Sequence, residues 1–448
     1  MEKKRPKHHG VASLRGIDHV PCSASHQPGR FGRLFGALPA LTLERKVLEE
    51  LAKSMREEDG AGGDSATPAG FTFLGQFIDH DITLDTTSSL DSQSDPAAVR
   101  NMRTPTLELD SVYRGGPEAD PMLYDQTREG RLFTGTRENP DDLARNNQGT
   151  ALIGDPRNDE NGLISQLHLG FMRFHNGVMA LLEEGKVKGP RYYDDDFREA
   201  QRLVRWHYQW IIVNEFLPFI VDRKVLTSIE RDGFTIYNRA TPFIPVEFSV
   251  AAYRFGHSQV RNSYLVNREV GELNLFRPPG LTSFGPVPPS HVVDWRYFFE
   301  FGKIKPQGSR LIDTKLATEL FDLPFVPDSD VPALPMRNLL RGQTFSLPSG
   351  EAVACRMGVE PIPTAKLGTG LEQNPLWFYC LREAELNRED RLGEVGGRIV
   401  AETLLGLLHT DPSSYVSQAK CWRPTLPTGR DGEFGMSDLL RIAYRQGR

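Results

Sequence analysis

The spacing of apolar residues predicts a chain built mainly from helices. The clearest stripe begins at Leu163 and runs through Val178 to Leu181, with apolar residues recurring every three or four positions, which is the repeat of one helical face. Similar patterns predict further helices at residues 43–55, 195–217, 245–262, 292–302, 313–321, 374–387 and 397–409. The sequence shows neither a strand–helix alternation nor a long internal repeat. We therefore predict a mainly α fold with little β structure.

Loops are expected to occupy much of the first third of the chain. Residues 57–70 are rich in Gly, Ser and Asp, and residues 88–159 in Asp, Pro, Gly and Thr, which is typical of irregular backbone. Residues 1–40, rich in Gly, Pro, His and Arg, are expected to form an extended arm over the body. Because no segment has the composition of a flexible linker, residues 41–448 are expected to form one large helical domain with long ordered loops.

The composition constrains the partners of the chain. It has 448 residues with 53 basic and 59 acidic side chains, which give a formal net charge of −6. A mildly acidic chain without a basic block beyond its N-terminal residues is poorly suited to bind a phosphate backbone, so no nucleic-acid partner is expected. Hydrophobic residues make up 39% of the chain, enough for a sizeable core.

The four cysteines, Cys22, Cys355, Cys380 and Cys421, lie far apart, and none forms a Cys-x-x-Cys pair. This spacing argues against a disulfide framework and against a cysteine-bound zinc site. No apolar run reaches the roughly 18 residues that a membrane helix needs, and no hydrophobic segment follows the charged N-terminus. The sequence therefore predicts no membrane span and no conventional secretion signal. A cytoplasmic location is the default expectation, and leaderless secretion is the alternative.

A first cluster of polar residues lies at 75–83. If this segment is helical, Gln76, Asp79 and His80 share one face, because they are three and four residues apart. A neutral imidazole next to carboxylates, here Asp79 and Asp81, can serve as a general base or as a metal ligand. The alternative is a capped helix end that contains a hydrogen-bonded histidine.

Two further clusters carry an arginine and a histidine. Residues 154–160 read Gly-Asp-Pro-Arg-Asn-Asp-Glu, and they either cap the helix that follows or hold Arg157 as a fixed cation that faces a site. His257 ends an apolar stripe that includes Tyr253. It is either a hydrogen-bonded core residue or a ligand. Gly256 beside it has no side chain and would leave room for a flat planar group.

Four short motifs, taken together and in order, are specific. They are Gln-x-x-Asp-His-Asp at 76–81, Gly-Asp-x-Arg-x-x-Glu at 154–160, Arg-Phe-Gly-His at 254–257 and Asn-x-x-Arg-Gly at 338–342. Their combination resembles the animal-type haem peroxidases, the peroxidase–cyclooxygenase superfamily, and more narrowly a bacterial member of it. The resemblance covers about residues 30–420. It implies a single haem peroxidase domain that binds haem b.

The third and fourth motifs match the residues that hold the haem in this family. The resemblance implies that His257 binds the haem iron through one ring nitrogen and that Asn338 accepts a hydrogen bond from the other ring N–H. It implies that Arg341 pairs with a haem propionate. Asp79 and Glu160 match two carboxylates that form ester bonds to haem methyl groups in mammalian members, so ester-linked haem is also an expectation.

The first and second motifs match the side of the haem that binds peroxide. The resemblance implies that His80 is the base that takes a proton from hydrogen peroxide and returns it, with Gln76 beside it. Arg157 would stabilise negative charge on the leaving oxygen. The implied enzyme is a peroxidase that reduces hydrogen peroxide through a ferryl haem intermediate and then oxidises halide, thiocyanate or small organic donors.

The resemblance also implies a calcium site next to His80. Asp81 matches a calcium ligand, and alternate residues of the loop at 104–113 can direct oxygen atoms at one hard cation. The expected loop ligands are Thr104, Thr106, Glu108 and Asp110. Glu108 stands where the family usually has aspartate, and its extra methylene could loosen the geometry. The alternative is an acidic loop in contact with solvent.

Two other functions remain open at this point. Fatty-acid dioxygenases of the same superfamily use a tyrosyl radical, and their tyrosine lies three residues before the haem-binding histidine. That position holds Arg254 here. Tyr253 lies one residue earlier, about 100° away on an α-helix, so we expect it to point elsewhere. The other alternative is a non-catalytic haem-binding or adhesion protein.

Overall fold

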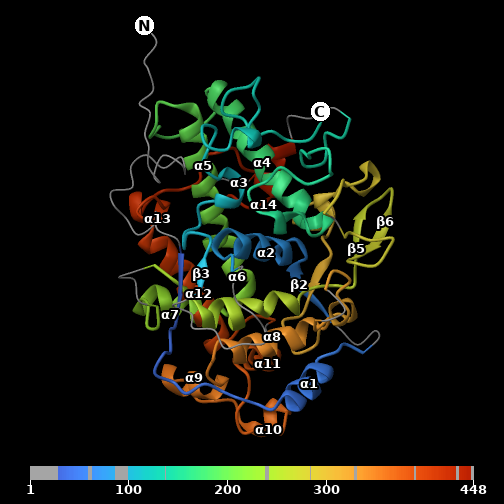
Figure 1. Ribbon diagram of the computed structural model, residues 1–448. Helices are drawn as coiled ribbons and strands as arrows, with labels where there is room; N and C mark the ends of the chain where they lie inside the picture. Colours follow the sequence, from blue (N-terminus) through green and yellow to red (C-terminus); the bar gives the residue numbers. More distant parts are fainter. Residues whose placement is uncertain are drawn as a thin grey trace.

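Helices are the main regular element of the computed structural model (Figure 1), and the prediction of a mainly α fold is confirmed. The structure describes residues 29–58, 63–85, 99–136, 138–237, 242–282, 284–326, 330–387, 390–429 and 433–444. Residues 1–28, most of the predicted N-terminal arm, lie outside the described part of the chain, and the domain boundary at residue 41 stays a prediction. None of the helices in these ranges combines the length and the apolar character of a membrane-spanning segment.

Helix α2, Gly70–Ile82, lies near the centre of the molecule (Figure 1). Almost every residue of α2 is buried, as expected of a helix that is hydrophobic on nearly all sides. The long helix α4, Gly162–Glu183, packs against α2. Phe77 of α2 stacks on Phe171 of α4 with ring centroids 4.4 Å apart. Aromatic packing therefore fixes the position of α2 against α4.

Helix α4 forms a group with α5, Asp196–Ile211, and α14, Met436–Tyr444. Asn161 caps α4, because its side chain accepts hydrogen bonds from two backbone N–H groups of the first turn. Helices α4 and α14 approach closely at Gly177, where an added Cβ would lie 3.0 Å from the carbonyl oxygen of Ile442. A larger residue at position 177 would push the two helices apart.

A second group of helices lies below α2 in the view of Figure 1. Its members are α1 Arg45–Ser54, α7 Arg223–Asp232, α8 Leu334–Thr344, α9 Gly350–Met357, α11 Leu376–Asn387 and α12 Glu394–Thr410. Between this group and α2 runs a segment that is not α-helical. It consists of a π-helical turn at Glu247–Ala251 and a 3-10 helix at Ala252–His257, and it packs against α8, α11, α12 and α2. The segment thereby joins the second group to α2.

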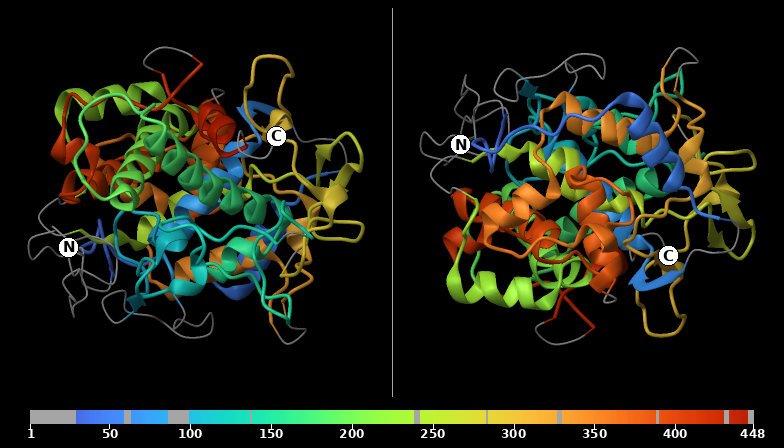
Figure 2. Two further views of the ribbon diagram at one scale, coloured as in Figure 1. Left: turned by 90° about the horizontal axis from the view of Figure 1, so that it is seen from above. Right: turned by 90° about the horizontal axis from the view of Figure 1, so that it is seen from below.

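The strands are short and form three small sheets. Strand β1, Gly29–Gly32, lies between β3, Arg100–Asn101, and β4, Ile244–Pro245; β2, Asp64–Pro68, pairs with β7, Gly308–Arg310; and β5, Ser263–Asn267, forms a hairpin with β6, Gly271–Asn274. Phe31 of β1 lies opposite Ile244 in a parallel pair. The hairpin, yellow in Figure 2, stands out at the side of the helical body.

Short helical turns connect the longer helices. They are α3 Asp110–Tyr113, α6 Leu217–Ile220, α10 Thr364–Leu367 and α13 Tyr415–Gln418, with 3-10 turns at Pro121–Leu123, Pro156–Asp159, Pro289–His291, Trp295–Tyr297 and Thr318–Phe321. The predicted helix at 195–217 continues past Pro218 to Ile220, through a π-helical turn at Ile212–Phe216. Proline is tolerated there because it lies in the first turn of α6.

The predicted α-helix at 245–262 is wrong. Ile244–Pro245 is a strand that pairs with β1, and the residues that follow change from π-helical to 3-10 hydrogen bonding. The change occurs at Ala251, whose φ and ψ are −127° and −81°. The apolar period correctly indicated burial, because the segment packs between helices, but burial alone does not specify which hydrogen bonds the backbone makes.

The predicted α-helices at 292–302 and 313–321 are also wrong. Only single 3-10 turns form there. In the range 292–302, Trp295, Phe298 and Phe299 are buried. Phe298 and Phe299 follow Trp295 by three and four residues, which is also the spacing of one face of an α-helix. These aromatic side chains reach the core without a continuous run of helical hydrogen bonds, so the period alone indicated the wrong element.

Candidate functional site

A large cavity lies between α2 and the 3-10 helix at Ala252–His257. Its volume is about 490 Å³, within the roughly 300–1,000 Å³ range of small-molecule and cofactor sites. Three of the four sequence motifs contribute polar side chains to its wall. The polar and charged residues that line it include Gln76, Asp79, His80, Glu160, Arg254, His257, Asp330 and Arg337. Aromatic and aliphatic side chains, among them Phe71, Phe276 and Phe325, form much of the remaining wall.

His80 lies in the last turn of α2, and only 6% of it is exposed. Its Nδ1 atom lies 2.7 Å from Oδ1 of Asn158. Because an amide oxygen only accepts hydrogen bonds, Nδ1 carries the ring proton and the lone pair is on Nε2. Burial, aided by the charge of Arg157, lowers the pKa of His80 to about 3. The ring is therefore neutral near pH 7 and has a nitrogen that can accept a proton.

Gln76, Asp79 and Glu160 line the same cavity as His80. The amide of Gln76 donates a hydrogen bond to the carboxylate of Glu160. Burial raises the pKa of Glu160 to about 7. It also raises the pKa of Asp79, although the nearby charge of Arg157 opposes this shift. The structure thus brings to the cavity wall two carboxyl groups that ionise less readily than in water.

Arg157 lies beside α2, but it is not among the residues that line the cavity. Its guanidinium donates to the backbone carbonyl oxygens of Thr83, at 2.5 Å, and of His80, at 3.1 Å. It also pairs with Asp155, where Nη2 lies 2.8 Å from Oδ2. The cation therefore complements the carbonyl groups at the C-terminal end of α2, and in this arrangement it acts on the His80 ring through its charge.

His257 is the last residue of its 3-10 helix and lines the cavity. Its Nδ1 atom lies 2.8 Å from Nδ2 of Asn338 on α8. An amide nitrogen only donates, so Nδ1 of His257 accepts this hydrogen bond, whereas the expected direction was the reverse. The cause is the guanidinium of Arg254, which donates to Oδ1 of Asn338 at 2.7 Å and so orients the amide. Burial lowers the pKa of His257 to about 3.

Helix α8 carries two further arginines. Arg341 lies outside the set of cavity-lining residues; its Nη2 donates to the carboxylate of Asp85 at 2.6 Å. Arg337, one turn earlier, lines the cavity and pairs with Asp330 at 2.8 Å. Burial lowers the pKa of Arg254 to about 10, and the charges of both arginines add to this effect. Arg254 and Arg337 thus bring two guanidinium groups to the cavity wall, and the carboxylate of Asp330 balances the second.

All five residues from Tyr253 to His257 line the cavity. The prediction that Tyr253 points elsewhere is therefore wrong, because the segment is not an α-helix with a single face toward the site. The hydroxyl of Tyr253 donates to the carbonyl oxygen of Gly75 in α2 at 3.1 Å. At Gly256 an added Cβ would meet no atom of the described chain within 4 Å, so the space next to His257 is open.

Asp81, a predicted calcium ligand, is fully buried. Its Oδ2 accepts a hydrogen bond from the N–H of Leu109 at 3.1 Å. Within the described residues its Oδ1 has no hydrogen-bond partner, and neither has the buried hydroxyl of Thr106. Burial raises the pKa of Asp81 to about 8, and the charge of Glu108 adds to this effect. A buried carboxylate oxygen without a partner is the kind of group that a bound cation would satisfy.

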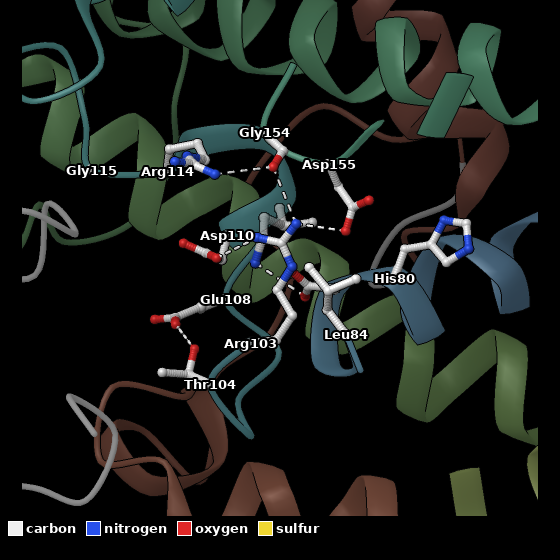
Figure 3. A network of polar contacts seen from close by, with 12 residues as sticks. His80, Leu84, Arg103, Thr104, Glu108, Asp110, Arg114, Gly115, Gly154 and Asp155 are labelled. Atoms are coloured by element: carbon white, nitrogen blue, oxygen red, sulfur yellow. Dashed lines mark hydrogen bonds and ion pairs between the residues drawn. The ribbon is translucent and has the colours of Figure 1, made fainter. Parts of the chain in front are cut away.

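Arg103 organises the loop that carries the other predicted calcium ligands (Figure 3). Its guanidinium donates to the carboxylates of Asp110, at 2.6 Å, and Asp155, at 2.5 Å. The hydroxyl of Thr104 donates to the carboxylate of Glu108. In the part of the chain that the structure describes, no three His, Cys, Asp or Glu side chains are grouped so as to hold a metal ion. Asp110 is directed toward an arginine in this arrangement.

Comparison with known proteins assigns the middle of the chain to a family. The sequence model of the family described as animal haem peroxidase matches residues 89–278. Residues 89–278 are thus similar to the animal haem peroxidase family, and this range is less than half of the chain. The match supports the predicted family, for which haem is the expected cofactor, whereas the narrower bacterial branch stays a prediction. The matched range of this chain contains the second and third motifs. His80 and Asn338, which belong to the first and fourth motifs, lie outside it.

Individual relatives of the haem peroxidase segment agree with this assignment. Chorion peroxidase of Drosophila melanogaster is 34% identical over 128 residues, which are 27% of this chain and 16% of that protein. The chain thus spans less than a fifth of that relative. Two solved structures share the fold. Peroxidase A from Dictyostelium discoideum is 15% identical, with a TM-score of 0.56 over 88% of this chain and 89% of that one. Fatty acid alpha-dioxygenase of Arabidopsis thaliana is 14% identical, with a TM-score of 0.60 over 88% and 75%.

Two residues that contact the cavity histidines or their partners were not predicted as site residues. Asn158 contacts His80 from 78 positions away in the chain, and nothing local in the sequence indicates this contact. Arg254 belongs to the third motif and stands where the dioxygenases have a tyrosine, but no site role was predicted for it. Its charge within an otherwise apolar stripe is a signal that could have indicated a buried polar contact such as the one it makes with Asn338.

Proposed function

We propose that this chain is a haem-dependent peroxidase of the bacterial branch, which reduces hydrogen peroxide and oxidises a halide, thiocyanate or a small organic donor. The observation that carries the proposal is that His80 and His257 line one cavity of a volume suited to a cofactor. Gly256 supports it, because the absence of a side chain leaves open space for a planar group beside His257.

Residues of all four motifs would hold the haem. His257 is the proposed ligand of the iron, and Asn338, which contacts its Nδ1, is the group that orients its ring. Arg341 is the proposed partner of a haem propionate. Asp79 and Glu160, which both line the cavity, are the proposed sites of ester links. Bound haem would supply the redox chemistry that amino-acid side chains lack.

His80 is the proposed base. Its Nδ1 proton is engaged by Asn158, so Nε2 can take a proton from one oxygen of hydrogen peroxide and return it to the other. Two electrons from the donor and two protons then complete the reduction of one peroxide to two waters. Gln76 would hydrogen-bond the peroxide from the same wall. Burial and, after it, the positive charge of Arg157 keep the ring neutral, and the same charge would stabilise negative charge on the departing oxygen.

The proposal includes a calcium ion between the end of α2 and the loop that follows. Asp81 Oδ1 and Thr106 Oγ1, buried and without partners in the described chain, support it. The full proposed set is Asp81, Thr104, Thr106, Glu108 and Asp110. Asp110 would have to leave Arg103 to join this set. A bound ion would fix the loop to the residue that follows His80 on α2.

A fatty-acid dioxygenase is the second candidate. It is favoured by the fold that the chain shares with the Arabidopsis alpha-dioxygenase and by Tyr253, which lines the cavity. Two observations place it second. The hydroxyl of Tyr253 is engaged by the carbonyl of Gly75, and the position three residues before His257 is held by Arg254, whose guanidinium binds Asn338.

The test is an absorption spectrum of the haem-loaded chain before and after hydrogen peroxide, with iodide as the donor. We expect a Soret band that changes on addition of peroxide, and iodide oxidation that depends on peroxide. Oxygen uptake with an unsaturated fatty acid and no peroxide would favour the dioxygenase instead. Haem binding with neither reaction would leave a non-catalytic haem protein. Extraction of the haem under denaturing conditions separates ester-linked haem from free haem.

A further inference from the structure

The geometry points to a role for Asn158: we propose that it is a positioning residue that holds His80 in the tautomer with its proton on Nδ1. This inference rests on the proposed peroxidase function, in which Nε2 of His80 has to accept a proton. Asn158 stands at a position of the second motif that specifies no residue type. The motif therefore does not account for this asparagine, and the contact with His80 does.

The backbone around Asn158 is firmly held. The residue is fully buried in the 3-10 turn Pro156–Asp159, and its N–H donates to the carbonyl oxygen of Asp155 at 3.0 Å. Asp155 is itself buried between the guanidinium groups of Arg103 and Arg157, at 2.5 and 2.8 Å; Figure 3 shows the first of these pairs. One buried and one partly buried ion pair thus fix the turn that presents the amide of Asn158 to α2.

The side-chain amide of Asn158 lies between two histidines. Its Oδ1 is 2.7 Å from Nδ1 of His80, and its Nδ2 is 3.0 Å from Nδ1 of His168 on α4. Because the oxygen accepts and the nitrogen donates, a single amide sets the two rings in opposite tautomers. His80 carries its proton on Nδ1, and His168 carries its proton on Nε2. The turned-over amide would reverse both assignments together, which makes the arrangement testable at two rings.

Asn158 reaches the cavity through His80. His80 is one of the residues that line the cavity, whereas Asn158 is not. Without the amide, the His80 ring can adopt the tautomer with its proton on Nε2, which presents a donor where the reaction requires an acceptor. A residue that only filled space would leave the tautomer unchanged when replaced by a side chain of similar size, and this separates positioning from packing.

The first test is nitrogen NMR of the full chain with isotope-labelled histidines, before haem is added. Signals of the two rings are identified by their loss in His80→Gln and His168→Gln. We expect the Nδ1–H form for His80 and the Nε2–H form for His168. The reverse pair of tautomers would overturn the proposal, since it would mean that the amide of Asn158 faces the other way.

Two substitutions of Asn158 then separate hydrogen bonding from packing. Asn158→Asp keeps an acceptor toward His80, and we expect the Nδ1–H form to persist. Asn158→Leu has a similar size but no hydrogen bond, and we expect the Nε2–H form of His80 to appear. An unchanged tautomer in a folded Asn158→Leu would show that another group positions the ring. If that variant does not fold, loss of the Nδ1–H form in folded Asn158→Asp is the outcome that refutes the proposal.

The haem-loaded variants give a second readout. Asn158→Leu should slow the reaction with peroxide by about 100-fold, the lower end of the effect of a general base, while the KM for iodide stays unchanged. Asn158→Asp should recover most of the rate. If the unsubstituted chain does not react with peroxide, the proposed function is wrong, and the tautomers of His80 and His168 still decide how Asn158 is placed.

Discussion

Two histidines that line the same cavity each contact an asparagine, but the hydrogen bonds run in opposite directions. At His80 the amide oxygen of Asn158 lies 2.7 Å from Nδ1, and at His257 the amide nitrogen of Asn338 lies 2.8 Å from Nδ1. The residue types, the ring atom and the distances match. Nevertheless, His80 carries its proton on Nδ1 and His257 carries its proton on Nε2.

The difference comes from the second partner of each amide, the group that it contacts besides the cavity histidine. Asn158 directs its nitrogen to His168, which accepts at Nδ1. Asn338 has its oxygen occupied by Arg254, which can only donate. Both asparagines are buried, at 0% and 1% exposed, so neither amide can turn toward water instead. An asparagine next to a buried histidine therefore does not determine the tautomer by itself; the group on the far side of the amide does.

The tautomer of His257 affects how this residue could bind haem iron. An imidazole that binds iron through Nε2 needs its proton on Nδ1, which is the opposite of the tautomer found here. Haem binding would therefore require the amide of Asn338 to turn and Arg254 to find another acceptor. Asp79, which lines the same cavity and whose charge acts on Arg254, is an acceptor of suitable charge.

The largest effect is expected from His257→Ala. Removal of the proposed iron ligand should abolish stable haem binding, because the metal loses the imidazole nitrogen that the cavity provides. Titration of the haem-free variant with haemin, followed by the Soret band, measures this loss. His291→Ala, in a turn that does not border the cavity, is the matched control and should bind haem normally. A normal Soret band in His257→Ala would contradict the ligand assignment.

The next largest effect is expected from His80→Ala. This variant should retain haem but react with peroxide roughly 10²- to 10⁴-fold more slowly, the usual contribution of a general base. Stopped-flow absorbance after mixing with hydrogen peroxide measures the rate, and His291→Ala again serves as the control. The two histidines are thus expected to differ in kind: one variant loses the cofactor, and the other loses the reaction. An unchanged rate would exclude His80 as the base.

Much of the fold could be predicted from apolar spacing, and the exceptions have physical reasons. Helices α4, α11 and α12 were predicted because their stripes are long and continuous. Helix α8, which carries Asn338, was not predicted, since its short stripe is interrupted by the two arginines at 337 and 341. The segment at 247–257 was assigned the wrong hydrogen bonds, because burial between helices does not require an α-helix.

The candidate site was likewise predicted only in part: the residues could be named, but the directions of their hydrogen bonds could not. Motifs recognised in the sequence named residues that the structure brings to one cavity, His80 and His257 among them. The directions of the hydrogen bonds could not be predicted. The amide of Asn338 is oriented by Arg254, 84 positions away, and Asn158 contacts His80 across 78 positions. The direction of each hydrogen bond depends on the second partner of the amide, and the position of that partner is known only from the folded chain.

Removal of calcium should affect the His80–Asn158 contact more than the His257–Asn338 contact. The reason is that Asp81, a proposed calcium ligand, directly follows His80 on α2. In the presence of excess calcium, at about 100 times Kd, a bound ion adds about 2.7 kcal/mol to the free energy of unfolding. Chelation should therefore lower Tm by several degrees and broaden the NMR signals of His80 while those of His257 stay sharp. Asp81→Asn is the control and should remove the sensitivity to chelator. No change in Tm or in the His80 signals would refute the calcium proposal.

The smallest effect is expected from Arg254→Met, and it tests the comparison of the two pairs most directly. Loss of the guanidinium frees Oδ1 of Asn338, so the amide can turn and accept from Nδ1 of His257. Nitrogen NMR of the haem-free chain should then show for His257 the Nδ1–H form that is also expected for His80, with haem affinity changed by about tenfold, the lower end of the effect of groups that orient a metal ligand. Arg254→Lys keeps a donor and should preserve the Nε2–H form. If Arg254→Met also preserves the Nε2–H form, Arg254 does not set the direction of the hydrogen bond between Asn338 and His257. The two histidine–asparagine contacts would then differ for another reason.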